Sequence, residues 1–183
     1  MQQLPQERLS LAQGAVVETE RALAMTLDFV KQRKAFGQRI LDFQNTKFKL
    51  AECKTEALIG RTFVDQCLIK HLDGNLDSST ASMAKYWCTD KQNQIIDVCL
   101  QMHGGAGFMD EYEISRMYRD ARVQTIYGGT NEIMKELIGR TLEWWPAEHE
   151  YFTGEYRATK RQTTNGIHKI RFIDSGYNDS THC

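Results

Sequence analysis

The feature that most constrains the fold is a helical repeat of small and apolar side chains at the start of the chain. They recur at steps of three and four: Leu9, Ala12, Val16, Thr19, Leu23, Thr26 and Val30. This spacing puts them on one face of an α-helix. Pro5 suits the first helical turn, and the pattern predicts one helix over residues 5–34, with Gly37 ending the run. At 1.5 Å per residue, such a helix is roughly 40 Å long.

Two more long helices and two short ones are predicted from the same pattern. The second helix has apolar residues at Phe48, Leu50, Ala57, Phe63, Val64, Cys67 and Leu68. The third begins at a cap, Asp77 or Ser78, and ends at the Gly-rich stretch after His103. A short helix over residues 114–121 and a final helix from Ile133 follow. Long helices joined by short loops, with only two prolines in the chain, favour an all-α, up-down four-helix bundle.

The pattern changes near residue 143. Trp144-Trp145-Pro146 closes the final helix, and the later residues lose apolar periodicity and become rich in Thr, Asn, Gly and charged side chains. Segments of this composition bury too little apolar surface to fold alone. We therefore expect a helical bundle over residues 3–142 and a divergent, disordered tail over residues 143–183, with at most a short strand at 167–173.

Composition excludes some classes of partner. A net charge of −1 gives no reason to expect nucleic acid or an anionic membrane surface. No apolar run is long enough to span a bilayer, and the N-terminus lacks the pattern of a signal or transit peptide. The five cysteines form no CxxC, and four lie among apolar neighbours in helical patterns. We therefore predict buried free thiols and an intracellular, reducing compartment.

Four segments carry candidate binding or catalytic residues, and each also has a purely structural interpretation. On spacing alone, Glu7 and Arg33 are interpreted as charges that suit the two ends of a helix dipole, although a guanidinium also suits a phosphate. Residues 101–107 are either a helix C-cap or a backbone surface for a flat cofactor. They follow a helix and not a strand, which excludes a Rossmann fingerprint. Residues 127–133 combine two glycines with a helix cap at Thr130, whose N–H groups can receive an anion or a carbonyl oxygen.

Several common chemistries lack their residues. No Glu-x-x-His pair is present, which argues against a di-iron bundle. The histidines show no HExxH or zinc-ligand spacing, so we expect no metal site. No serine or cysteine lies in a nucleophile-elbow sequence.

Taken together and in order, the segments resemble the C-terminal helical domain of the acyl-CoA dehydrogenases, most of all the long-chain subgroup. The resemblance covers about residues 5–142. The runs that carry it are Gln6-Glu7-Arg8-Leu9, Lys31-Gln32-Arg33-Lys34-Ala35-Phe36-Gly37, Asp42-Phe43-Gln44, Ala84-Lys85-Tyr86-Trp87, Gln101-Met102-His103-Gly104-Gly105, Asp120-Ala121-Arg122-Val123 and residues 126–138.

The resemblance implies oxidation of a long-chain acyl-CoA to the trans-2-enoyl-CoA in fatty-acid β-oxidation. In this family a carboxylate removes a proton from Cα while hydride passes from Cβ to FAD, and such a base needs desolvation and a raised pKa. Most members carry the base directly after the tyrosine of the turn, where this chain has Gly128. In the long-chain and isovaleryl subgroups the base comes from the first helix of this domain, which makes Glu7 the catalytic candidate. Arg8, Gly128 and Gly129 are then expected to border the acyl-CoA.

The same motif matches imply contacts with FAD and with partner proteins. The expected FAD contacts are Arg33, Gln44, Gln101, Met102, His103, Gly104, Gly105, Thr130, Asn131 and Glu132. Arg33 is expected at the diphosphate, and residues 101–105 on the cofactor of a neighbouring subunit. The family further implies electron-transfer flavoprotein as the acceptor, a homodimer or homotetramer, and either the mitochondrial matrix or the bacterial cytoplasm.

Members of the family contain an N-terminal helical domain and a β-domain before this bundle, and the β-domain holds much of the flavin ring and the acyl-CoA. We expect this chain to lack both and to be inactive alone. The alternative is a non-catalytic helical oligomerisation module derived from the family. Retention of Glu7, Arg33 and the Gly-rich segments favours the catalytic interpretation, since a packing module does not need them.

Overall fold

A computed structural model describes residues 3–142, and these form a bundle of helices. The α-helices are α1 (Leu4–Gln32), α2 (Gln44–Leu72), α3 (Ser78–His103), α4 (Glu113–Val123) and α5 (Asn131–Gly139). Two 3-10 helices, η1 (Ile40–Asp42) and η2 (Gly104–Phe108), lie in the connections. The predicted tail over residues 143–183, including the weak strand, lies outside the described residues.

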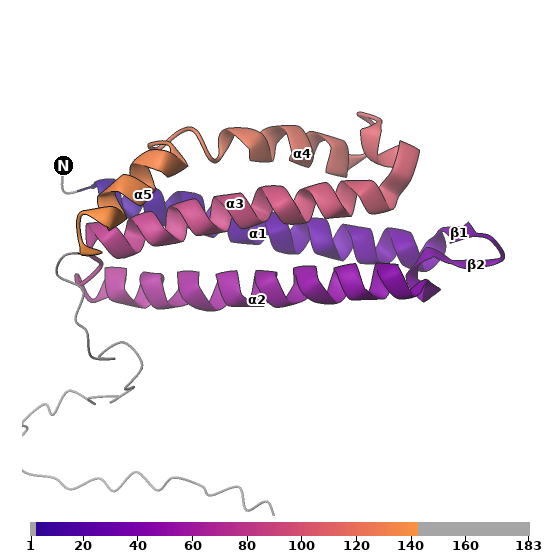
Figure 1. The fold of residues 1–183 in the computed structure, drawn as a ribbon, viewed down its shortest axis with the longest axis horizontal. Coiled ribbons are helices and arrows are strands. Elements are labelled where there is room, and N and C mark those ends of the chain that lie inside the picture. The colour runs from indigo at the N-terminus through magenta and orange to yellow at the C-terminus, as the bar shows by residue number, and fades with distance from the viewer. Residues whose placement is uncertain (1–2, 143–183) are drawn as a thin grey trace, which may run out of the picture. The chain divides into compact units, whose positions relative to one another are not determined.

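The three long helices lie side by side, and α4 and α5 follow one another along α3 (Figure 1). The two short helices therefore take the place of a fourth long helix, which residues 124–130 divide. The all-α bundle predicted from the sequence is confirmed. The predicted caps are confirmed as well: the Asp77 side chain accepts from the Thr80 N–H, and the Thr130 hydroxyl accepts from the Ile133 N–H.

The end of α1 differs from the prediction. The helix stops at Gln32, and the chain then forms a small antiparallel hairpin of β1 (Lys34–Ala35) and β2 (Gln38–Arg39). Phe36 and Gly37 between the strands both have positive φ, at 52° and 82°. Two such residues make the tight turn that suits a short hairpin. Periodicity could not reveal two-residue strands, and Gly37 was interpreted as a helix stop alone.

Small side chains allow the helices of the core to approach closely. Ala12, Ala15 and Ala22 of α1 and Ala81 and Ala84 of α3 are fully buried. The four cysteines of the described chain, Cys53, Cys67, Cys88 and Cys99, are buried and free, as predicted; Cys183 lies outside the described residues.

Helix α3 also buries polar side chains, which is unusual for the centre of a bundle. Ser82, Lys85, Thr89 and Gln92 are fully buried, and all four lie on the side of α3 that also carries the core alanines. Buried polar groups are costly unless they are hydrogen-bonded. We therefore expect these four side chains to make specific hydrogen bonds towards the α5 end of the bundle.

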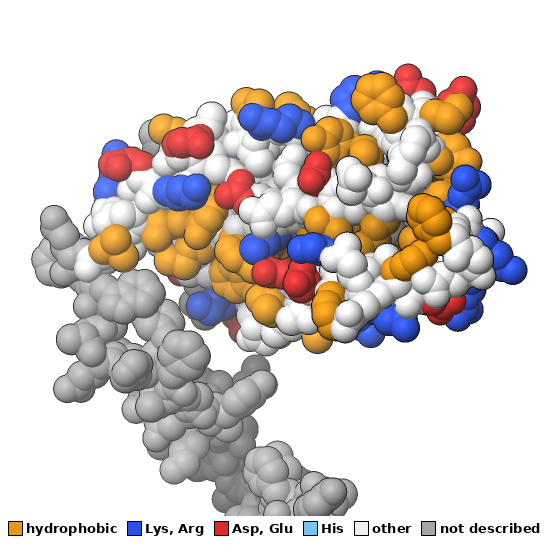
Figure 2. Space-filling view, turned by 45° about the vertical axis from the view of Figure 1, so that its right-hand side comes forward, with side chains coloured by type: hydrophobic (Ala, Val, Ile, Leu, Met, Phe, Trp, Pro, Cys, Tyr) orange, Lys and Arg blue, Asp and Glu red, His pale blue; other side chains and the backbone are white. Residues whose placement is uncertain are grey.

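Apolar side chains also remain on the surface (Figure 2). On α2 the exposed ones are Phe48, Leu58, Ile59, Leu68, Ile69 and Leu72. The apolar residues predicted for this helix are therefore only partly in the core, because Phe48 and Leu68 lie on the surface. None of the helices in residues 3–142 is both long enough and apolar enough to cross a membrane.

Candidate functional site

The predicted site residues fall into two groups at opposite ends of α1. Arg33, Gln44 and Gln101–Gly105 lie near the β1–β2 hairpin, whereas Glu7, Arg8 and residues 128–132 lie near the start of α1 and at α5 (Figure 1). Along α1, the rise of 1.5 Å per residue puts Glu7 and Arg33 roughly 40 Å apart. A single extended dinucleotide is too short to contact both groups in one chain.

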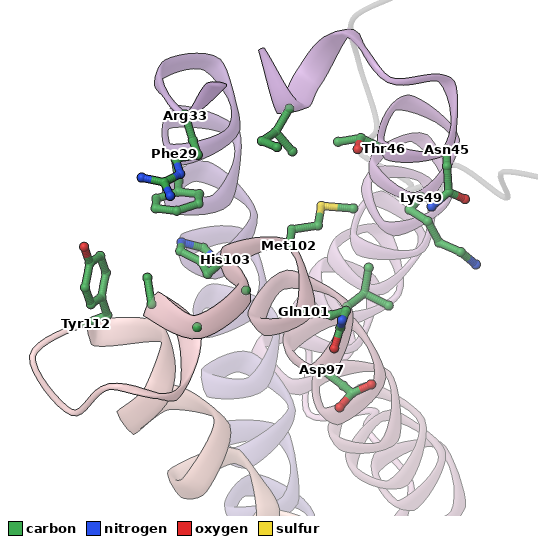
Figure 3. Close-up of a pocket in the computed structure, with 15 residues that line it drawn as sticks. Phe29, Arg33, Asn45, Thr46, Lys49, Asp97, Gln101, Met102, His103 and Tyr112 are labelled. Carbon is green, nitrogen blue, oxygen red and sulfur yellow. The ribbon is translucent and has the colours of Figure 1, made fainter. Parts of the chain in front are cut away.

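The hairpin end contains a hollow of about 700 Å³, which we call the hairpin-end hollow. The hollow is lined by side chains from all three long helices (Figure 3). They are Phe29 of α1 and Arg33 directly after it, Asn45, Thr46 and Lys49 of α2, and Gln101, Met102 and His103 of α3, followed by Gly104, Gly105 and Tyr112. The structure thus brings together Arg33 and all five residues predicted from the Gly-rich segment. Gln44, the first residue of α2, is exposed beside Asn45 but does not line the hollow.

The hairpin-end hollow offers cationic and flat groups to a planar anionic ligand, although the Asp97 carboxylate also lines it. No carboxylate in the described part of the chain pairs with Arg33, which leaves its planar donor fork free for a phosphate. His103 stacks on Phe29 with ring centroids 4.3 Å apart. Its Nδ1 lies 2.8 Å from the carbonyl oxygen of Cys99, so Nδ1 must carry the proton that it donates. A Cβ added at Gly105 would meet no atom within 4 Å, so bare backbone faces open space there.

The other end is organised by the turn over residues 124–130, which we call the glycine turn. Gly128 and Gly129 have positive φ, at 66° and 93°. A Cβ at Gly128 would lie 2.4 Å from Leu11 Cδ1, and one at Gly129 would lie 2.7 Å from Met134 Cε. The position that lacks the family's usual glutamate therefore packs directly against α1.

Leu11 is one helical turn after Glu7, and residues four apart in a helix lie on the same face. The glycine turn thus lies close to the part of α1 that carries the predicted base. Glu7 is exposed, and among the described residues no hydrogen bond or ion pair engages its carboxylate. The desolvation that a base needs is not provided within this domain.

Arg8, next to Glu7, is buried, with only 7% of its surface exposed. Its Nη1 donates to the hydroxyls of Ser78, at 2.9 Å, and Ser82, at 3.2 Å. Its buried Nε has no acceptor among residues 3–142. This guanidinium is therefore directed into the start of α3, and no acid of the described chain neutralises it.

Free backbone donors line the glycine turn. Within the described chain, the N–H groups of Gly128, Gly129 and Thr130 have no protein acceptor, whereas those of Ile126, Tyr127 and Asn131 are satisfied by Val123 and Thr125. Consecutive free N–H groups next to a helix N-terminus favour a negatively charged or carbonyl oxygen. Hydrogen bonds from its own N–H and from the Thr130 hydroxyl lower the pKa of Glu132, which is exposed.

Asn131 lies in the interior, not on the surface where a cofactor contact was expected. It is 3% exposed, and its amide bonds to Lys85, Thr89 and Asp90. The sequence analysis included Lys85 only as part of the run Ala84-Lys85-Tyr86-Trp87. Its position on the face shared by Ala81 and Cys88 was the available signal, because a lysine among core positions must find partners.

Glu18 was also missed. Burial raises the pKa of this α1 carboxyl; a hydrogen bond from Gln92 opposes that rise, and Asp120 adds to it. A perturbed carboxyl is a candidate acid or base. Glu18 lies three helical turns from Glu7, and its carboxylate is already bound by the buried Gln92. In the described chain no group of three or more His, Cys, Asp or Glu residues could hold a metal ion.

Comparison with known proteins was made by sequence and by structure. Residues 1–143 match the family model described as acyl-CoA dehydrogenase, C-terminal domain. Over 142 residues the chain is 54% identical to the mitochondrial long-chain specific acyl-CoA dehydrogenase of Sus scrofa, covering 78% of this chain and 33% of that protein. It is 34% identical over 142 residues to subunit CarC of the caffeyl-CoA reductase-Etf complex of Acetobacterium woodii, covering 78% and 38%.

A solved structure agrees with these matches. The crystal structure of an acyl-CoA dehydrogenase from Geobacillus kaustophilus superposes with a TM-score of 0.77 at 46% identity, covering 78% of this chain and 38% of that one. The chain thus spans about a third of the length of the curated relatives it matches.

Proposed function

Since the chain belongs to the acyl-CoA dehydrogenase family, matching its C-terminal domain, we propose that it supplies the base and part of the FAD site of a long-chain acyl-CoA dehydrogenase. The proposed reaction oxidises the acyl-CoA to the trans-2-enoyl-CoA. The remaining domains of the family, which hold much of the flavin and the substrate, are required for it.

One observation carries the proposal: Gly128 lies against Leu11, a helical turn from Glu7. A carboxylate at position 128 in other members and a carboxylate at position 7 here can therefore reach the same place from two segments. Gly128 also leaves no room for a side chain, because a Cβ would contact Leu11 at 2.4 Å. The structure thus accommodates a base on α1 and opposes one on the glycine turn.

In this proposal Glu7 removes the proton from Cα, and the glycine turn holds the thioester. The free N–H groups of residues 128–130 provide donors for its carbonyl oxygen or for cofactor oxygens. Glu7 is exposed in this domain, so the other domains and the acyl chain must exclude water from it and raise its basicity.

The residues present fit FAD, divided between two chains. Arg33 has a free guanidinium, the backbone at Gly105 faces open space, and Phe29, His103 and Tyr112 offer flat surfaces in the hairpin-end hollow. When bound, FAD supplies the acceptor for the hydride from Cβ. Because Gly128 packs on Leu11, the rise from residue 11 to residue 33 puts the glycine turn and the hairpin-end hollow roughly 33 Å apart along α1. We therefore propose that one chain provides the glycine turn and another provides the hairpin-end hollow. A homodimer or homotetramer follows, and the exposed apolar face of α2 suits contact between copies.

The partners and the compartment are proposed on the same basis. A relative from an Etf complex supports electron-transfer flavoprotein as the acceptor. A mitochondrial relative and bacterial ones support the mitochondrial matrix or the bacterial cytoplasm.

The test replaces three carboxylates in the full-length context and follows anaerobic flavin reduction by a long-chain acyl-CoA. Glu7→Gln should lower the reduction rate by about 10²–10⁴-fold while FAD stays bound, as expected for loss of a general base. Glu136→Gln, at an exposed site on α5, is the control and should reduce at the wild-type rate. If Glu7→Gln reduced flavin at the wild-type rate, or if Glu18→Gln lost more of that rate, Glu7 would not be the base.

The alternative is a non-catalytic helical oligomerisation module, favoured by the exposed apolar face of α2. The two are separated by the flavin spectrum of the purified chain when it is combined with the other domains of the family. A flavin that binds and is bleached by acyl-CoA supports the enzyme; a colourless oligomer supports the module.

A further inference from the structure

One buried charge has no part in the proposed reaction. Lys85 of α3 is fully buried, and no acid among residues 3–142 forms an ion pair with it. Moving an ammonium group out of water is strongly unfavourable unless the interior provides hydrogen bonds. A methionine of similar size would fill the same space without that cost. The contacts of the ammonium group must therefore explain its presence.

Both contacts of Lys85 belong to the segment that borders the proposed active site. Its Nζ donates to the carbonyl oxygen of Gly129, at 2.8 Å, and to Oδ1 of Asn131, at 2.7 Å. The lysine thus ties the middle of the bundle to the glycine turn and to the first residue of α5.

Asn131 links the ammonium group to a carboxylate. Its Nδ2 donates to Asp90 Oδ1 at 2.7 Å and to Thr89 Oγ1 at 3.0 Å, while its Oδ1 accepts from Lys85. The amide therefore bridges a buried cation and a partly exposed anion, and its orientation is fixed from both sides. Burial lowers the pKa of Lys85, whereas Asp90 and Glu132 favour its charged form.

The contact at Gly129 also fixes the direction of the next N–H group. In a planar trans peptide, the carbonyl of Gly129 and the N–H of Thr130 point in opposite directions. The described chain contains no cis peptide bond. With the carbonyl held inside by Lys85, the Thr130 N–H points away from the bundle interior, and it has no acceptor within residues 3–142. A positive charge on the carbonyl side also polarises that peptide and strengthens its N–H as a donor.

We propose that Lys85 is a positioning residue of the active site, which holds the Gly129–Thr130 peptide so that the Thr130 N–H is presented to the bound FAD and substrate. Asn131 then acts through Lys85 and Asp90, and not as a direct cofactor contact. The identity of the bound molecules rests on the proposed function; the clamp on the peptide does not.

The clamp is tested first on this chain alone, by amide hydrogen exchange. In Lys85→Met, exchange at the Asn131 and Tyr127 N–H groups, which are bonded to Thr125 and Val123, should rise by about tenfold or more as the turn opens locally. The matched control is Lys91→Met. Lys91 lies on the same helix, but its ammonium group pairs with Glu56 and does not contact the glycine turn. This variant should leave these two sites unchanged. Equal exchange in wild type and Lys85→Met would overturn the proposal. If Lys85→Met does not fold, Lys85→Leu, which also lacks a donor, is measured in its place with the same two outcomes.

The second test uses the full-length enzyme and separates positioning from a merely structural role. Lys85→Met should lower the limiting rate of flavin reduction by about tenfold or more with little change in KM, since the affected donor acts on the reacting complex. Lys85→Gln, which keeps a hydrogen-bond donor but no charge, should reduce flavin at a rate between those of wild type and Lys85→Met. A variant that only melts earlier and reduces flavin at the wild-type rate would show a structural role and overturn the proposal. If wild type itself is not reduced by acyl-CoA, the proposed function fails, while the exchange experiment still decides on the clamp.

Discussion

The closest contact in the glycine turn predicts a large and specific cost for one added methyl group. In Gly128→Ala, the new Cβ would lie 2.4 Å from Leu11 Cδ1, and the backbone would stay at a φ of 66° that alanine rarely adopts. The backbone strain costs about 1–3 kcal/mol. Overpacking against Leu11 adds about 1–3 kcal/mol. Since alanine also restricts the unfolded chain, by about 0.4–1 kcal/mol, we expect a net loss of about 2–5 kcal/mol in the free energy of unfolding.

Two other glycines separate strain from contact. Gly104 has a φ of 57°, but no atom lies within 4 Å of an added Cβ, so Gly104→Ala should cost the strain alone, about 1–2 kcal/mol. Gly105 has neither strain nor contact, and Gly105→Ala should change stability by less than about 0.5 kcal/mol. Leu11→Ala combined with Gly128→Ala should recover the part due to overpacking, which a double-mutant cycle isolates.

Urea unfolding of this chain, followed by far-UV circular dichroism, measures all of these variants. The expected order of destabilisation is Gly128→Ala, then Gly104→Ala, then Gly105→Ala. If Gly128→Ala costs no more than Gly104→Ala, or if Leu11→Ala shows no coupling to it, the glycine turn does not lie against α1. A catalytic side chain at position 128 would then no longer be excluded.

Three further variants test the glycine turn, the hairpin-end hollow and the buried thiols. In the full-length enzyme, adding Gly128→Glu to Glu7→Gln should restore only slow flavin reduction. Adding Leu11→Ala as a third change should raise that rate, because it removes the contact at 2.4 Å. No gain from Leu11→Ala would contradict this. Arg33→Gln should weaken FAD binding by about tenfold or more, as a charge-assisted bond to the diphosphate is worth about 1.5–3 kcal/mol. Flavin fluorescence titration measures this, with Arg140→Gln at the far end as the control that should bind normally. Burial raises the pKa of the Cys88 thiol to about 12 and that of the Cys99 thiol to about 11. Unfolded thiols ionise near pH 8.5, so the folded state holds more protons above that pH and stability falls as pH rises, by about 1.4 kcal/mol per pH unit for each thiol. Urea unfolding between pH 8 and 11 should show a shallower fall in Cys88→Ala/Cys99→Ala, and equal slopes would exclude these thiols as the cause.

Periodicity was enough to predict the long helices, because apolar side chains recur at helical spacing along each of them. The Asp77 cap could be predicted for a local reason: a short acidic side chain reaches the N–H of Thr80 three residues later. The hairpin after Arg33 could not, since strands of two residues leave no alternation to detect. The exposed leucines and isoleucines of α2 followed the same helical spacing as buried ones, so spacing alone could not separate a core face from a surface left for a partner.

The sequence proposes a set of site residues, but it does not give their arrangement in space. Glu7 on its own is indistinguishable from a helix-end charge, and only the contact between Gly128 and Leu11 brings the turn beside its helix. The resemblance predicted that residues 101–105 serve the cofactor of a neighbouring subunit, but sequence order alone does not show that the proposed FAD contacts lie at two ends of the bundle. The family resemblance predicts Asn131 as an FAD contact, whereas in the structure its side-chain amide bonds to Lys85 and Asp90.

The central claim is that one catalytic site takes its base from one chain and its diphosphate contacts from another. It is tested most directly by reassembling two full-length variants together: Glu7→Gln, which lacks the base, and Arg33→Glu, a charge reversal that repels the diphosphate and prevents FAD binding. If the claim holds, each mixed pair contains one site with both Glu7 and Arg33 intact, and flavin reduction by acyl-CoA returns in the mixture although neither parent shows it. If Glu7 and Arg33 served the same site within one chain, the mixture would stay as inactive as its parents, and the claim would be contradicted.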